Sequence, residues 1–129
     1  MTGIQPGSYL SIAALRSVRP GREVSLLARV LRTWEAGAFR MCLLGDDTGL
    51  IRLRLAQDGV EEGRAYVFGR VRVLRFTGGW QSLQATPNSE MVPSDEPVRV
   101  AADDAYISRV YKILTGLEKK RATLGADLY

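Results

Sequence analysis

Two arginines alternate with apolar side chains in the segment Leu50–Leu55, and this spacing points to anion binding rather than to catalysis. A half-buried β-strand turns alternate residues to opposite faces, so the apolar residues of this segment would face a core. Arg52 and Arg54 would then project from the opposite, solvated face. Guanidinium groups bind phosphates in a fork and stack on bases, so this strand would suit a polyanionic partner.

The other basic residues show the same preference for arginine. Fifteen of the 18 are arginines, and the three lysines, Lys112, Lys119 and Lys120, all lie near the C-terminus. The formal net charge of +4 permits a polyanionic partner but also suits plain solubility. A genome that favours arginine codons would produce the same composition, so both explanations stay open at this point.

Residues for catalysis or metal binding are scarce. The chain has no histidine and a single cysteine, Cys42, so a transition-metal site and the usual nucleophile–base pairs are not expected. Asp46 and Asp47 are carboxylates of the kind that hold Mg²⁺ or Ca²⁺. An aspartate that accepts backbone N–H bonds inside a tight turn explains them without a ligand. We therefore expect a protein that is not an enzyme and that has no cofactor and no metal.

Length and hydropathy limit the class of protein. The 129 residues fit one domain. No apolar run approaches the roughly 20 residues that cross a bilayer, and residues 1–8 lack the pattern of a secretory signal. With one cysteine, no internal disulfide can form. We expect a protein without membrane contact that works inside the cell, in the cytoplasm or nucleoid, or in the nucleus of a eukaryote.

Hydrophobic periodicity and turn residues predict five strands. They are expected at Val24–Glu35, Phe39–Leu44, Leu50–Ala56, Arg64–Phe76 and Trp80–Thr86. The turn Gly45–Gly49 would join the second and third strands into a hairpin. Gly69 indicates a bulge or bend in the fourth strand, which leaves the directions of Tyr66 and Phe68 open.

A C-terminal helix is predicted from Asp103 or Asp104, either of which is a good N-cap, to about Arg121. Its apolar residues cover more of the helix surface than one contact requires, so we expect an interface with a partner subunit or a second copy. The interface residues would be Ile107, Val110, Tyr111, Leu114 and Leu117. The chain then divides into a flexible N-terminus (residues 1–10), a β-domain (11–90), a linker (91–102), the helix (103–122) and a tail (123–129).

The order of these parts resembles the nucleic-acid-binding OB domains of the replication protein A and archaeal single-stranded DNA-binding protein family. The resemblance covers about residues 11–90 and includes Gly45-Asp46-Asp47-Thr48-Gly49, similar to the family's Gly-Asp-Glu-Thr-Gly turn with Asp47 for the usual glutamate. Arg75-Phe76-Thr77-Gly78-Gly79 is similar to the aromatic-x-Gly segment between the family's fourth and fifth strands. The resemblance implies a mainly β fold, a five-stranded OB-fold barrel, followed here by a C-terminal α-helix.

Family members bind single strands by stacking bases on aromatic rings in a basic groove across strands two and three and the adjoining turns. Carried over to this chain, the groove would contain Arg32, Trp34, Phe39, Arg40, Arg52, Arg54, Arg70, Arg72, Arg75, Phe76 and Trp80. Aromatic residues of a small β-domain also build cores, and exposed arginines also pair with acids such as Glu61 and Glu62. Each of these residues therefore has a structural explanation as well.

The sequence departs from the family's pattern at two places in the barrel, because Ala56 and Arg72 stand where single-domain members often carry aromatic residues. The C-terminal helix looks more like the small subunits of replication protein A and telomere-capping complexes, which assemble through that helix. Three functions remain open. They are single-stranded DNA binding in replication, repair or recombination, a role as an assembly subunit whose barrel is a scaffold, and binding of RNA or transfer RNA.

Overall fold

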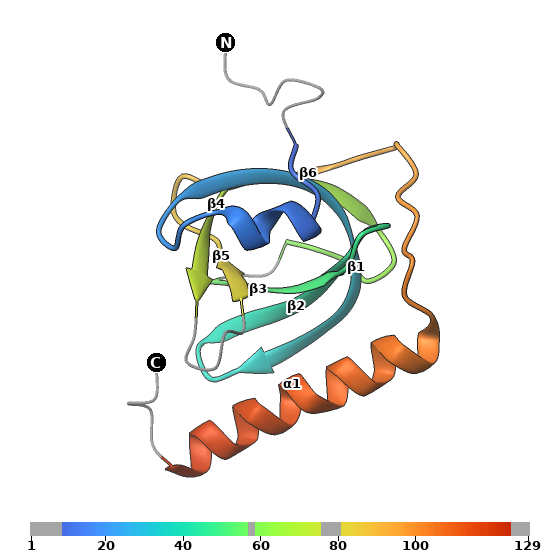
Figure 1. Cartoon of the computed structure of the whole chain (residues 1–129). Helices are drawn as coiled ribbons and strands as arrows, with labels where there is room; N and C mark the ends of the chain where they lie inside the picture. Colours follow the sequence, from blue (N-terminus) through green and yellow to red (C-terminus); the bar gives the residue numbers. More distant parts are fainter. Residues whose placement is uncertain (1–8, 57–58, 76–80, 125–129) are drawn as a thin grey trace.

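The structure is a computed structural model that describes residues 9–56, 59–75 and 81–124, with side chains as far as residue 117 (Figure 1). A short 3₁₀ helix comes first and an α-helix last. The elements are η1 (Ala13–Ser17), β1 (Glu23–Ala36), β2 (Phe39–Gly45), β3 (Leu50–Leu55), β4 (Ala65–Arg75), β5 (Gln81–Gln84), β6 (Glu90–Pro93) and α1 (Asp104–Leu124).

Strands β1 to β5 close into a barrel. The sheet order is β1-β2-β3-β5-β4, and β4 pairs again with β1. Strands β3 and β5 run parallel, and the other pairs in the ring are antiparallel. A closed ring removes the exposed strand edges that an open sheet presents. The predicted fold, a five-stranded barrel followed by a C-terminal helix, is therefore confirmed.

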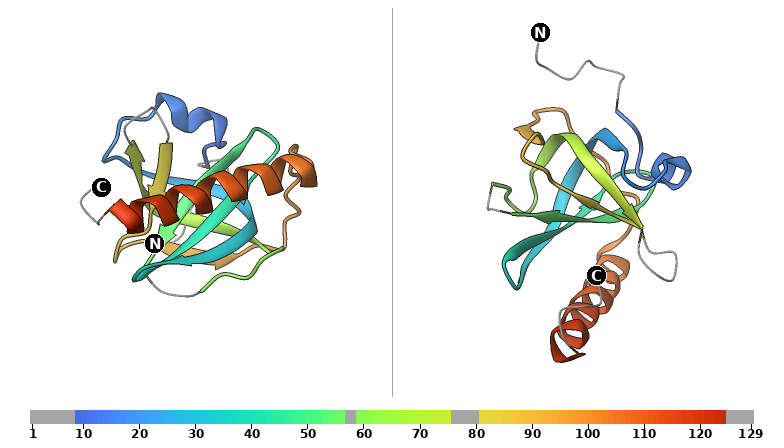
Figure 2. Two further views of the ribbon diagram at one scale, coloured as in Figure 1. Left: turned by 90° about the horizontal axis from the view of Figure 1, so that it is seen from below. Right: turned by 90° about the vertical axis from the view of Figure 1, so that its left-hand side faces the viewer.

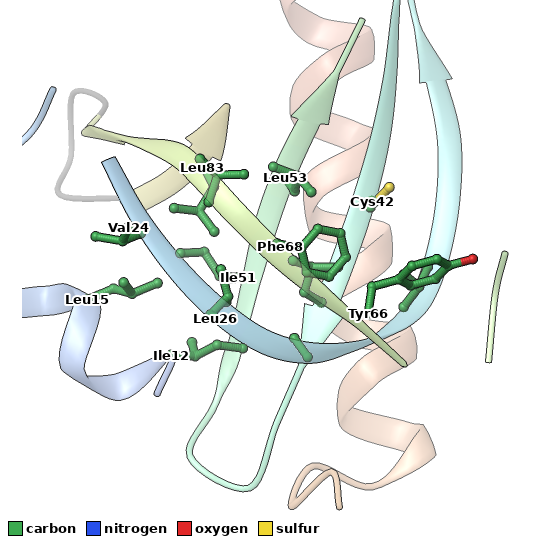
Figure 3. Close-up of a cluster of buried hydrophobic side chains, with 14 of the residues drawn as sticks. Ile12, Leu15, Val24, Leu26, Cys42, Ile51, Leu53, Tyr66, Phe68 and Leu83 are labelled. Atoms are coloured by element: carbon green, nitrogen blue, oxygen red, sulfur yellow. The ribbon is translucent and has the colours of Figure 1, made fainter. Parts of the chain in front are cut away.

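The barrel interior is filled by alternate apolar residues (Figure 3). In one cross-strand row Leu53 of β3 pairs with Leu83 of β5, which pairs with Val73 of β4, and all three are fully buried. Leu15 of η1 and the preceding Ile12 pack against this core. Full burial of each such side chain contributes about 1.5–3 kcal/mol, which makes this cluster the main stabilising feature of the fold.

A bulge interrupts β4 at the predicted place. Val71 pairs with Val24 of β1, but Phe68 pairs with Leu26, so one residue of β1 faces two residues of β4. Arg70, one of these two residues of β4, has a positive φ of 57°. Because a bulge shifts the alternation by one position, side chains on both sides of it reach the core. Tyr66 and Phe68 before the bulge are buried, as are Val71 and Val73 after it.

The sixth strand, β6, was not among the predicted strands, because three prolines in this region, Pro87, Pro93 and Pro97, favour an extended connection over a strand. Along β4, strand β5 pairs with the second half alone, from Arg72 to Arg75. The same side of the first half of β4 is taken by β6, which pairs with Tyr66 to Gly69. Proline is tolerated at a strand end, and Pro93 is the last residue of β6.

The C-terminal helix has a side-chain N-cap and packs on the outside of the barrel. The backbone N–H of Tyr106 donates to Asp103 Oδ1 at 2.8 Å, which confirms Asp103 as the N-cap residue. Viewed from below in Figure 2, α1 crosses the outer face of β1 and β2. The contact forms a second apolar cluster outside the barrel, made of Leu31, Trp34, Met41, Leu43, Ile107 and Leu114.

Candidate nucleic-acid interface

Strand register places two of the predicted arginines in one row on the outside of the barrel. Arg54 of β3 pairs with Gln84 of β5, and Gln84 pairs with Arg72 of β4. The adjacent row, Leu53–Leu83–Val73, points into the core, so this row points outward. The two arginines are thus separated by one strand, about 10 Å across the sheet.

An aromatic ring lies beside this row. Phe39, the first residue of β2, is 38% exposed. The Arg54 guanidinium carbon lies 4.6 Å from the centre of the Phe39 ring. This distance is within cation–π range, so Arg54 holds one face of the ring and fixes its orientation. An aromatic ring and a cation held together on an exposed β-surface can stack on a base and contact a phosphate at the same time.

Arg70 and Arg72 extend the basic surface along β4. Both are exposed. Neither side chain has a hydrogen bond or an ion pair with any residue that the structure describes. Cations without a carboxylate partner remain available for an external anion. Arg54, Arg70, Arg72, Gln84 and Phe39 together form what we term the outer basic surface.

Trp34 is covered by the helix and not exposed as a stacking platform. Its side chain points outward from β1, as strand alternation requires, but α1 covers it and leaves only 9% exposed. Its ring makes an edge-to-face contact with Tyr111, with the ring centres 5.4 Å apart. The indole Nε1 is buried without a hydrogen-bond partner among the described residues. Because α1 covers this part of the predicted groove, Trp34 is a packing residue here.

The other predicted arginines have partners within the chain or are buried. Arg52 points outward in register with Leu43, yet it is only 6% exposed. Arg32 donates to its neighbour Leu31 O at 2.7 Å. Arg40 lies 3.6 Å from the Glu35 carboxylate. Arg75 donates to the carbonyl oxygens of Arg16 and Val18, each at 3.4 Å. Of the remaining predicted residues, Phe76 and Trp80 lie outside the described residues, as do residues 77–79 between them.

The five predicted interface residues of the helix divide between two surroundings. Ile107 and Leu114 are each 4% exposed, and with Val110 and Tyr111 they pack on the chain's own barrel. Leu117 is 39% exposed and Ile113 is 45% exposed. Much of the wide apolar surface is therefore used within the chain, which the periodicity of the helix alone could not reveal.

One residue of the outer basic surface, Gln84, was missed by sequence reasoning. It lies between Arg54 and Arg72 and offers an amide that can donate and accept. Its position depends on the parallel pairing of β3 with β5, for which the local sequence carries no signal. No metal-binding group of three acidic or cysteine residues occurs within the described part of the chain. None of the described helices is long and apolar enough to cross a membrane.

No protein-family model and no curated protein matches the sequence. Several solved structures share its fold. An OB domain from Methanosarcina mazei is 24% identical, with a TM-score of 0.65 over 78% of this chain and 94% of that chain. Schizosaccharomyces pombe Pot1pC bound to ssDNA is 16% identical, with a TM-score of 0.58 over 69% of this chain and 88% of that chain. The Ifi202 HINa domain in complex with 20bp dsDNA is 12% identical, with a TM-score of 0.60 over 74% of this chain and 55% of that chain. These similarities establish the OB fold.

Proposed function

We propose that this chain is a non-catalytic OB-fold protein that binds single-stranded DNA during replication, repair or recombination. The observation that carries the proposal is the outer basic surface, where Arg54 and Arg72 flank Gln84 and Phe39 presents an exposed ring beside Arg54. Two of the three similar structures named above have DNA bound, one with a single strand and one with a duplex.

Binding would combine two physical contributions. A base stacked on Phe39 contributes about 1–3 kcal/mol, and it does so for any base because every base has a π-face. Arg54, Arg70 and Arg72 would neutralise phosphates and release counterions, which makes the affinity fall as salt rises. Stacking requires an unpaired base, so the combination favours single strands over duplexes.

The test is a fluorescence titration with a labelled oligothymidine of about 20–30 nucleotides at two salt concentrations, with a duplex of equal length for comparison. We expect salt-sensitive binding that prefers the single strand. Phe39→Ala should weaken binding about 5- to 150-fold, because it removes a stacking contact. Arg72→Gln should weaken binding about 5-fold, because it removes one charge-assisted contact. Lys112→Gln is the matched control, because Lys112 is exposed on α1 and is not part of the outer basic surface.

Three other results would change the proposal. Equal affinity for the duplex would assign the surface to double-stranded DNA, as in the HINa complex. Tighter binding of a matched RNA oligomer would favour an RNA or transfer-RNA function. No binding to any of these nucleic acids would refute nucleic-acid binding by this surface.

A second candidate function, as an assembly subunit, is favoured by the exposed side of α1. Ile113 and Leu117 present apolar surface that the chain's own barrel does not cover. Light scattering would compare the wild type with Leu117→Asp, because Leu114→Asp would disturb the packing of α1 on β1 and β2. A wild-type dimer or trimer that becomes monomeric in Leu117→Asp would support the candidate. Equal monomer masses would argue against self-association, and Lys112→Gln, which changes the net charge by the same one unit, is the control.

A further inference from the structure

A groove of about 1000 Å³ lies beside α1, on the side of the barrel where η1 packs. Its walls come from segments far apart in the sequence, namely η1, the β2–β3 turn, the facing ends of β4 and β5, and the first turns of α1. In Figure 1 η1 and α1 lie on either side of β3. The volume is at the upper end of the range of about 300–1000 Å³ that ligand sites in proteins occupy.

The chemistry of the lining suits an anionic ligand with flat apolar groups. Arg16 and Arg75 are the charged residues among those that line the groove, and no carboxylate is among them. Leu50 and Ile51 of β3 contribute apolar surface. Tyr106, in the first turn of α1, is 50% exposed and offers an aromatic ring. Cations beside an exposed ring are the combination that single-stranded nucleic acids select.

The packing of α1 explains why a nucleic-acid strand would bind in the groove. The helix covers Trp34, Met41 and Leu43 on the outer face of β1 and β2. A nucleic-acid strand could cross that face only by displacing the helix. The groove beside the helix is lined in part by residues of β3 and β5. A ligand bound there would leave the second apolar cluster intact.

We propose that nucleotides of a single strand occupy this groove, with a base stacked on Tyr106 and phosphates on Arg16 and Arg75. The inference rests on the proposed strand-binding function and adds a second contact region to it. Arg54 follows Leu50 by four residues along β3, which corresponds to about 13 Å. Stacked nucleotides repeat at about 3.4 Å, so three or four of them would join the two regions. The combined length fits the range of about 4–16 nucleotides that one OB fold covers.

Affinity measurements on the full chain test the role of each residue in the groove. With the same oligothymidine, Tyr106→Ala should weaken binding about 5- to 150-fold, the range expected for a lost stacking contact. Tyr106→Phe keeps the ring and should bind like the wild type. Arg16→Gln should weaken binding and Arg16→Lys should restore part of the loss. Both residues are exposed, so the variants should keep the wild-type thermal midpoint.

Photo-crosslinking shows whether the strand lies in the groove or is only attracted to it. An oligonucleotide carrying 5-iodouracil would be irradiated with the wild type, and the crosslinked peptides identified by mass spectrometry. We expect a crosslink at Tyr106, and its loss in Tyr106→Ala.

The outcomes separate this inference from the function on which it rests. If the wild type binds the strand and Arg72→Gln weakens binding, while Tyr106→Ala and Arg16→Gln bind normally and no crosslink forms at Tyr106, the groove is not a strand site and the proposed function stands. If the wild type binds no strand, both are overturned. Weaker binding in both sets of variants together with the Tyr106 crosslink supports both.

Discussion

At the scale of single residues, four donors converge on the buried carboxylate of Asp46. The backbone N–H groups of Thr48 and Gly49 and the Thr48 hydroxyl donate to Oδ1 at 2.8, 3.1 and 2.6 Å. The backbone N–H of Ile12 donates to Oδ2 at 2.9 Å. Asp46 therefore closes the β2–β3 turn and ties the start of η1 to it. This is the turn function expected for the aspartate from the sequence.

Replacing Asp46 should destabilise the whole barrel. Asp46→Ala leaves the buried Ile12 N–H and the turn donors without an acceptor, and we expect a loss of about 2–4 kcal/mol in the free energy of unfolding. Urea denaturation measures it. Asp47→Ala, at the exposed neighbouring position, is the matched control and should change stability by less than about 0.5 kcal/mol. Equal losses in the two variants would contradict the assigned role of Asp46.

At the scale of elements, α1 is held to the barrel by one side of its apolar surface. Ile107 and Leu114 are seven residues apart, which is about two helical turns, so they lie on the same face. Tyr111 lies between them and makes the edge-to-face contact with Trp34. Burial of the Trp34 Nε1 without a partner costs about 1–3 kcal/mol, which partly offsets the gain from this contact.

Trp34 fluorescence should report this contact. The chain has two tryptophans, so the measurement uses a Trp80→Phe background in which Trp34 alone emits. We expect blue-shifted emission from the buried indole and a red shift in Tyr111→Ala, because removal of the phenol ring admits water. Lys112→Ala, at the exposed adjacent position, should leave the spectrum unchanged. An unshifted spectrum in Tyr111→Ala would mean that the helix does not cover Trp34 in solution.

At the scale of the whole molecule, the basic residues are distributed unevenly with respect to the helix. Arg54, Arg70 and Arg72 belong to the outer basic surface, and Arg16 and Arg75 line the groove beside α1. Arg40, by contrast, lies 3.6 Å from the Glu35 carboxylate, which offsets its charge. The net charge of +4 therefore understates the charge that a strand would meet on these two surfaces.

The salt dependence of binding should count the arginines in contact with phosphate. For single strands the slope of log K against log salt is about −0.7 per neutralised phosphate, so the outer surface alone predicts about −2 and both regions together about −3.5. Titration at a series of salt concentrations measures the slope. Arg72→Gln should reduce its magnitude by about 0.7, and Lys112→Gln should not change it. A slope near zero would rule out phosphate contacts as a source of affinity.

Much of the fold follows from local patterns in the sequence. Apolar runs, alternation and turn residues located β1 to β5, Gly69 indicated a bulge or bend, and a cap at Asp103 or Asp104 marked the start of α1. These features depend on residues close together in the chain, where propensity, alternation and capping act directly. The outward directions of Arg54 and Arg72 followed from the same alternation once the bulge was allowed for.

Only the tertiary structure decided which outward-facing residues are open to a ligand. Trp34 and Arg54 both face outward from the barrel, but α1 covers the first, and the second lies against Phe39. Likewise, the parallel pairing of β3 with β5 places Gln84 in the outer basic surface. Arg16 and Tyr106 line one groove that is built from segments distant in the sequence. Alternation along a strand determines the face of a side chain. What covers that face depends on long-range packing, which no local pattern encodes.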